Sequence, residues 1–81
     1  MYIQTKILYR CVNHKVRYYK LYLTPTLFGE YLFVREYGSV KYKKPTRVIR
    51  EYYSSLEEAF SKFDKKLREK LFRGYGDMVL A

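Results

Sequence analysis

Basic and aromatic side chains interleave in the middle of the chain, on either side of Gly38. The cations of this stretch are Arg35, Lys41, Lys43, Lys44 and Arg47, and its aromatic residues are Tyr37 and Tyr42. Cations of this kind neutralise the phosphates of a nucleic-acid backbone, and flat aromatic rings stack on sugars or bases. The pattern therefore favours a surface for backbone contact and stacking. A solvated loop tip is the alternative for the lysines.

The whole chain is positively charged as well. Seventeen Lys and Arg residues stand against eight Asp and Glu residues, which leaves a formal charge of +9 in 81 residues. A positive field of this size attracts polyanions, nucleic acid first and anionic membrane second.

Residues suited to catalysis or metal binding are scarce. His14 is the only histidine and Cys11 the only cysteine, so neither a histidine-based metal cluster nor an intramolecular disulfide can form within one chain. The four glycines do not form a phosphate-binding loop. We expect no enzyme, metal, cofactor or small-molecule substrate, a solvated imidazole at His14 and a half-buried, inert thiol at Cys11.

The same sequence suggests where the protein acts. No stretch approaches the roughly 20 apolar residues of a membrane span, and the N-terminal residues lack the apolar core of a signal peptide. We expect a cytoplasmic protein with no membrane partner, associated with the bacterial nucleoid if it binds DNA.

Alternating apolar residues predict four strands ahead of a helix, at about residues 3–12, 17–24, 30–37 and 46–53. In the first strand, one alternating face carries Ile3, Ile7, Tyr9 and Cys11. In the second, Tyr19, Leu21 and Leu23 share one face, opposite Tyr18, Lys20 and Tyr22. In the third, we expect Leu32 and Val34 to be buried. Gly38 and Pro25 are expected to lie beyond strand ends.

An amphipathic helix follows the last strand. Ser54 or Ser55 can cap it, because Glu57 and Glu58 lie three residues after them. Its apolar stripe consists of Leu56, Ala59, Phe60, Phe63, Leu67 and Leu71, and Gly74 provides a left-handed C-terminal residue. We expect ion pairs Glu58–Lys62 and Glu69–Arg73 on a solvated far face. The apolar residues after Asp77 are expected to pack as a short tail.

These elements predict an α+β protein in which a small, twisted, mostly antiparallel sheet of about four strands packs against one C-terminal amphipathic helix. Eighty-one residues suffice for a single domain, residues 1–81.

Several short segments resemble the WGR domain, a module of poly(ADP-ribose) polymerases and of small stand-alone bacterial proteins. The matching segments are Tyr18 to Leu21, the aromatic–glycine step Tyr37-Gly38, the helix entry Tyr53 to Phe60, and Gly74-Tyr75. The resemblance covers about residues 17–77. It implies a twisted antiparallel sheet backed by one helix.

The resemblance also implies a role. In the polymerases this module contributes to recognising DNA breaks, and the tryptophan of its Trp-Gly-Arg motif lies against the sugar of a terminal nucleotide. By position, that contact falls to Tyr37, followed by Gly38 and Ser39. Tyrosine keeps a flat ring, whereas serine removes a charge and a bidentate donor.

We therefore predict a non-catalytic nucleic-acid-binding module that prefers DNA to RNA and contacts the backbone at an end or nick with little sequence readout. The expected nucleic-acid-binding residues are Tyr37, Gly38, Ser39, Arg35, Lys41, Tyr42, Lys43, Lys44 and Arg47. Arg47 and Arg50 should point to opposite faces of the last strand. Tyr18, Lys20 and Tyr22 form either a core tyrosine pair beside a lysine or an exposed platform able to stack unpaired RNA bases. The alternative function is a protein-interaction module that docks on an acidic partner or self-associates through a sheet edge.

Overall fold

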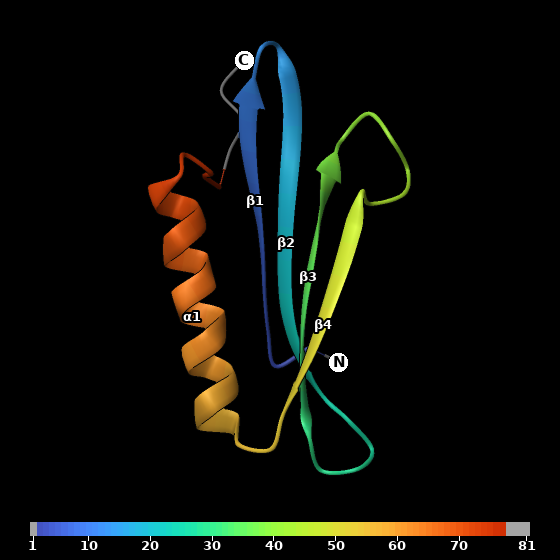
Figure 1. Cartoon of the computed structure of the whole chain (residues 1–81), viewed down its shortest axis with the longest axis vertical. Coiled ribbons are helices and arrows are strands. Elements are labelled where there is room, and N and C mark those ends of the chain that lie inside the picture. The colour runs from blue at the N-terminus through green and yellow to red at the C-terminus, as the bar shows by residue number, and fades with distance from the viewer. Residues whose placement is uncertain (1, 78–81) are drawn as a thin grey trace.

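The computed structural model describes residues 2–77, which form one antiparallel sheet with a single helix on one of its faces (Figure 1). The elements are β1 (Gln4–Val12), β2 (Lys15–Pro25), β3 (Tyr31–Ser39), β4 (Arg47–Tyr53) and α1 (Leu56–Phe72). Strand order in the sheet follows chain order, as a meander requires. The predicted α+β arrangement of four strands and one C-terminal helix is confirmed.

A two-residue turn joins β1 to β2. Val12 pairs with Lys15, which leaves Asn13 and His14 as the central turn residues with φ angles of 52° and 64°. Positive φ at both positions is the geometry whose twist matches antiparallel strands. Asn13 and His14 thus form the turn between the first two predicted strands, whereas Lys15 already belongs to β2.

The strand expected to stop before Gly38 continues through it. Gly38 pairs with Tyr18 and Ser39 pairs with Arg17, so β3 extends two residues beyond the predicted end at Tyr37. Likewise, Pro25 is the last residue of β2 and pairs with Tyr31. Proline has no backbone N–H to donate to the neighbouring strand. At the last residue of a strand this loss matters little, because no further strand pairing follows it.

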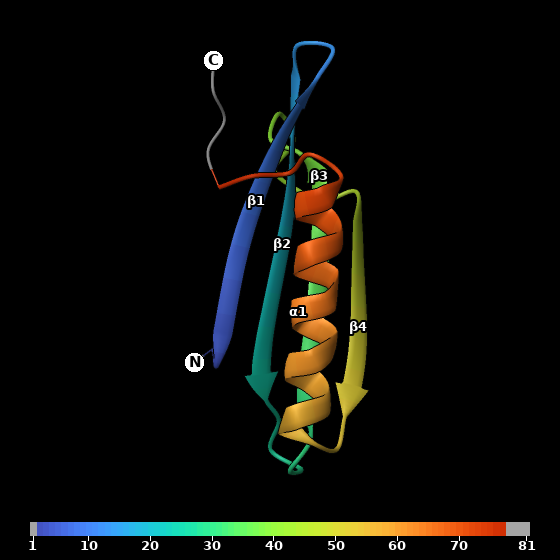
Figure 2. The same cartoon turned by 90° about the vertical axis from the view of Figure 1, so that its left-hand side faces the viewer.

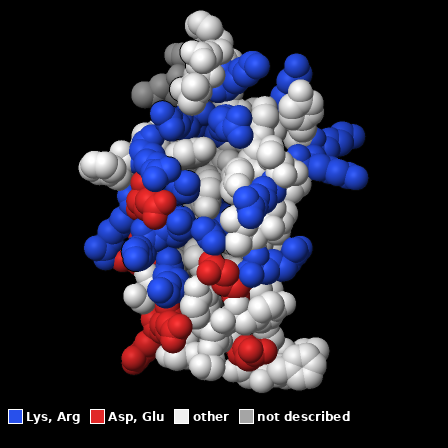
Figure 3. Space-filling model, in the orientation of Figure 1, with Lys and Arg blue, Asp and Glu red and all other residues white. Residues whose placement is uncertain are grey.

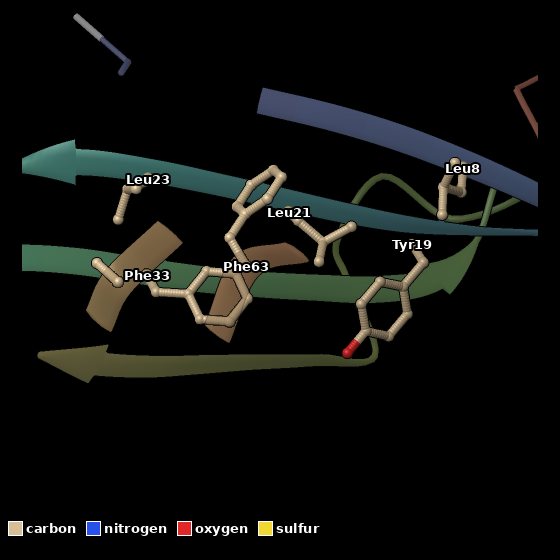
Figure 4. Packing of buried hydrophobic residues seen from close by; sticks show 7 residues of the cluster. Leu8, Tyr19, Leu21, Leu23, Phe33 and Phe63 are labelled. Atoms are coloured by element: carbon tan, nitrogen blue, oxygen red, sulfur yellow. The ribbon is translucent and has the colours of Figure 1, made fainter. Parts of the chain in front are cut away.

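The core lies between the sheet and α1, which runs along the sheet over β3 (Figure 2). Its buried members are Leu8, Tyr19, Leu21, Leu23, Phe33, Ala59 and Phe63 (Figure 4). The rings of Phe33 and Phe63 join the two layers, with centroids 5.6 Å apart. Burial of each large apolar side chain contributes roughly 1.5–3 kcal/mol, so this cluster is the main source of stability.

The shared faces predicted for Tyr19, Leu21 and Leu23 in β2 and for Ile7, Tyr9 and Cys11 in β1 are confirmed. The half-buried thiol expected at Cys11 is wrong: no helix covers that face of β1, and Cys11 is exposed there, as is Ile7 at 41%. Val34 is buried as expected, yet it faces away from α1, between its cross-strand neighbours Tyr22 and Arg50. Phe33 is the β3 residue of this region that meets the helix.

The ends of α1 are those the sequence predicts. Ser55 is the N-cap, and its Oγ accepts a hydrogen bond from the backbone N–H of Glu58 at 3.4 Å. At the other end, Gly74 adopts a φ of 99°, and the N–H of Tyr75 donates to the carbonyl of Lys70 at 3.1 Å. Together with the bond from Gly74 N–H to Leu71 O, this forms a Schellman motif, which turns the chain back toward the sheet.

The two polar pairs predicted along α1 are not those the structure contains. Lys66 pairs with Glu69 at 3.2 Å, and Asp64 pairs with Arg68. Lys66 thus pairs with the Glu69 carboxylate, which was expected to pair with Arg73. The apolar stripe is also narrower than predicted, since Phe60 is 37% exposed and Leu71 is 46% exposed.

After the helix, the chain crosses to the outer edge of β1. Tyr9 and Gly76 exchange both backbone hydrogen bonds, at 2.7 and 2.8 Å, and Lys6 pairs with Asp77 at 2.5 Å. This bridge occupies the β1 edge at Tyr9. The tail predicted after Asp77 lies outside the described residues.

Candidate nucleic-acid interface

Tyr37 lies near the end of β3 on the face of the sheet that carries α1. Its ring stacks on that of Tyr19, with centroids 5.4 Å apart and 5° between the ring planes. Tyr75 meets the same Tyr19 ring edge-on at 5.9 Å. Tyr37 is half-buried, so one ring face is fixed by Tyr19 while the residue still contributes to an open surface.

Tyr37 borders an open cavity of about 340 Å³ between the sheet and the C-terminal half of α1, called here the Tyr37 cavity. Its lining residues are Arg17, Tyr19, Arg35, Tyr37, Ile49, Lys66, Lys70 and Tyr75. Four of them are cations, three are tyrosines and none is acidic. Flat rings beside several cations are the combination expected of a site that stacks on a nucleotide and neutralises its phosphate.

The positive charge of the Tyr37 cavity is only partly compensated. Arg35 pairs with Glu51 at 2.8 Å, and Lys66 pairs with Glu69. Within residues 2–77, neither Arg17 nor Lys70 makes an ion pair. Those two cations are therefore free to meet an anionic ligand.

Lys70 is the most perturbed cation of the cavity. Its Nζ lies 4.6 Å from the centroid of the Tyr19 ring, a cation–π contact. Partial burial, followed by the neighbouring charges of Lys66 and Arg73, lowers the pKa of Lys70 below 10.5. A bound phosphate would raise the pKa of Lys70 again, because its negative charge would stabilise the protonated amine.

Gly38 has a steric role in the sheet. A Cβ at Gly38 would lie 2.8 Å from the backbone nitrogen of Thr46, whose N–H donates to Tyr37 O at 2.8 Å. Only glycine allows the start of β4 to come this close to β3. The aromatic–glycine step therefore fixes the backbone of Tyr37 against the loop between β3 and β4.

Ser39 organises the start of that loop. It pairs with Arg17 in the sheet, and its Oγ accepts a hydrogen bond from the N–H of Lys41 at 3.3 Å. Lys41 in turn lies over the Tyr42 ring, 5.9 Å from its centroid. The serine thus acts on the loop that carries the predicted basic residues.

The structure brings together only part of the predicted site. Arg35 and Tyr37 line the same cavity, and Arg47 lies directly across from Tyr37 in the neighbouring strand. Lys43 and Lys44 are exposed in the loop and do not line the Tyr37 cavity. They belong to the same end of the molecule, where the β3–β4 loop and the C-terminal end of α1 both lie (Figure 1).

Six residues of the cavity were not in the predicted site: Arg17, Tyr19, Ile49, Lys66, Lys70 and Tyr75. Lys66 and Lys70 are four residues apart and so share one side of α1, but neither was named as part of a binding surface. The Schellman motif returns Tyr75 to the sheet, and Arg17 joins through its pairing with Ser39. The four-residue lysine spacing was the available signal for this part of the site.

Charge is distributed unevenly along the molecule. Lys and Arg side chains dominate the upper part of the face in Figure 3, and acidic groups are more frequent toward its lower end. The upper end is the one with the β3–β4 loop and the Tyr37 cavity, so the predicted site lies in the positive half.

Comparison with known proteins gives one match. The family model of the WGR domain matches residues 5–79, and it includes β1, which lay outside the segments that carried the resemblance. No curated protein and no solved structure matches the chain. In the described part of the chain, no helix is long and apolar enough to span a membrane.

Proposed function

The chain belongs to the WGR domain family, which supports a nucleic-acid-binding module in general, and from that premise we propose that it binds the DNA backbone at an end or nick. The proposed module is non-catalytic and reads little sequence. The observation that carries the proposal is the Tyr37 cavity, in which a half-buried ring stands beside four cations with no acidic lining residue.

An end or nick suits Tyr37 because such a site exposes the flat surface of a terminal nucleotide. Tyr19 holds the ring nearly parallel to its own, so Tyr37 is oriented before any ligand arrives. A fixed ring loses little conformational freedom on binding, which favours affinity. An uninterrupted duplex offers no comparable surface, because its sugars and bases are flanked on both sides.

The phosphates would meet the cations around that ring. Arg17 and Lys70, which lack ion-pair partners among the described residues, are proposed to contact the phosphates nearest the break. Lys43 and Lys44 would reach the adjoining backbone from their exposed loop. If these cations neutralise about four phosphates, the slope of log K against log salt is roughly −3 to −4.

Low sequence readout follows from the position of α1. Its apolar stripe packs on the sheet through Ala59 and Phe63, and it runs parallel to the strands (Figure 2). Its proposed DNA contact, Lys70, lies beside the sheet in the Tyr37 cavity, whereas a recognition helix inserts its exposed face into the major groove to reach the base edges. The proposed contacts are therefore to phosphate and sugar, which carry no direct sequence information.

The alternative is an acidic protein docked on the same cations. Its affinity would also fall with salt, so salt dependence alone cannot separate the two. Fluorescence anisotropy with nicked duplex, blunt duplex, hairpin-closed duplex and single strand, each at two salt concentrations, separates them. The proposal predicts tighter binding to nicked and blunt duplex than to closed duplex, whereas equal weak binding to all four would contradict it.

A further inference from the structure

The turn between β2 and β3 presents two adjacent apolar side chains to solvent. Leu27 is 99% exposed and Phe28 is 87% exposed. Single exposed apolar residues are common on protein surfaces. Two in succession at the tip of a turn, far from the core, make a small apolar patch that the fold itself does not require.

This turn is well ordered by its own hydrogen bonds. The Thr26 N–H donates to Glu30 O at 2.9 Å, and Thr26 Oγ1 accepts from the N–H groups of Phe28 and Glu30 at 3.3 and 3.2 Å. Gly29 adopts the positive φ, 80°, that closes the turn. The two apolar side chains, called here the Leu27–Phe28 tip, are thus displayed by a preformed backbone, which lowers the entropy cost of docking.

A hollow of about 500 Å³ lies between the β1–β2 turn and the start of the β3–β4 loop. Its lining residues are His14, Lys15, Val16, Arg17, Ser39, Val40, Lys41 and Tyr42. Val16, Val40 and Tyr42 provide apolar surface. This Val40 hollow contains three cations and no acidic residue, and its volume is in the range of roughly 300–1,000 Å³ typical of ligand pockets.

The tip and the hollow have opposite charge. Glu30 adjoins the tip, and Glu57 and Glu58 begin the helix at the same end of the molecule (Figure 1). Lys15 and Lys41 line the hollow at the other end. Apolar contact surrounded by complementary charge is the pattern of a specific protein interface.

We propose that the Leu27–Phe28 tip of one copy of this chain docks in the Val40 hollow of a second copy. The two patches lie at opposite ends of a molecule whose longest dimension is 42 Å (Figure 1). Contact between two different patches is heterologous, so it continues head to tail instead of closing as a symmetric dimer. The association does not require nucleic acid, although Arg17 lines both the Val40 hollow and the Tyr37 cavity, so docking of a second copy would compete with the proposed DNA contact of that residue.

Sedimentation velocity over a concentration series up to roughly 1 mM is the test, because a contact made by so small a patch is expected to be weak. Salt of about 0.15 M screens the repulsion between chains of charge +9 beyond roughly 8 Å. The variants are Leu27→Ser/Phe28→Ser in the tip and Val40→Glu in the hollow. All three positions are exposed, so thermal unfolding should confirm that each variant folds as the wild type does.

We expect the wild type to form species larger than dimers, and each variant alone to associate at least tenfold more weakly. An equimolar mixture of the two variants keeps one intact tip and one intact hollow, so it should form dimers that grow no further. Lys15→Glu serves as a second hollow variant with the same expectation.

Two results would overturn the proposal. One is a wild type that stays monomeric throughout the series; if that monomer binds phosphatidylcholine vesicles through Leu27 and Phe28, the tip serves a lipid surface instead. The other is a Val40→Glu variant that associates as strongly as the wild type, since the tip would then not dock in the hollow.

Discussion

Tyr37 lies nearly parallel to Tyr19, with ring centroids 5.4 Å apart and 5° between the planes. Tyr19 is 3% exposed and belongs to the core, whereas Tyr37 borders the open Tyr37 cavity. The core therefore sets the orientation of the residue that we propose to stack on DNA. Stability and binding are therefore linked at this pair of rings.

Gly38→Ala should destabilise the fold. The added Cβ would lie 2.8 Å from the backbone nitrogen of Thr46, which a rigid strand pair cannot relieve cheaply. We expect a loss of about 1–3 kcal/mol in the free energy of unfolding, measured by urea denaturation. Gly76→Ala is the matched control, since nothing lies within 4 Å of its added Cβ. Equal stability of the two variants would contradict the close approach.

Ser55→Ala should weaken the start of α1. It removes the acceptor for the N–H of Glu58 and should cost about 1 kcal/mol, or roughly 4–8 °C in Tm for a domain of this size. Ser54→Ala provides the control, because Ser55 is the N-cap residue. If Ser54→Ala lowers Tm as much as Ser55→Ala does, the cap has been assigned to the wrong residue.

Lys70→Met should separate stability from binding. Because burial lowers the pKa of Lys70 in the folded state, the unfolded chain binds the proton more tightly, and the charged lysine destabilises the fold at neutral pH. The variant should therefore be more stable at pH 7, by a margin that shrinks as pH rises from the lowered pKa toward 10.5. Its affinity for DNA should fall, with the salt slope reduced by about 0.9.

Urea denaturation across pH and anisotropy across salt measure these two effects. Lys65→Met is the control, since Lys65 is exposed on the same helix and does not line the Tyr37 cavity. A Lys70→Met variant that binds DNA with unchanged affinity and salt slope would remove this lysine from the interface.

Cys11 should react readily in the folded protein. Its side chain is exposed on the face of β1 opposite α1, so a maleimide reagent should reach it without unfolding. We expect labelling within a few-fold of the rate in denaturant at the same pH. If Cys11 is labelled only after unfolding, its thiol is shielded, as the sequence suggested, and the exposed position is contradicted.

The sequence was sufficient to predict the strands and the helix, but not to predict which face of the sheet the helix covers. Strict alternation in β2 separates Leu21 and Leu23 from Lys20 and Tyr22, so its faces were predictable. In β3, Phe33 and Val34 are adjacent and both apolar. Alternation therefore cannot show which of the two faces α1. The packing of Phe63 on Phe33 shows that Phe33 does.

The candidate site, too, could be predicted from the sequence only in part. Arg35 and Tyr37 are two residues apart on one strand, so their common face follows from the period of a strand. Lys70 and Tyr75 enter the site through the packing angle of α1 and the turn after it. Those are tertiary features, and no local pattern near Tyr37 indicates them.

The most direct test of the DNA-end proposal is the ratio of Kd values for hairpin-closed and nicked duplex, compared between wild type and Tyr37→Ala. Stacking on one base contributes roughly 1–3 kcal/mol, so the wild type should favour the nick by about tenfold. Tyr37→Ala should abolish this preference, and Tyr37→Phe should retain it. Tyr52→Ala, which removes an exposed ring from the uncovered face of β4, should leave it unchanged. A wild type that binds closed and nicked duplex equally, or a Tyr37→Ala variant that keeps the full preference, would contradict the account.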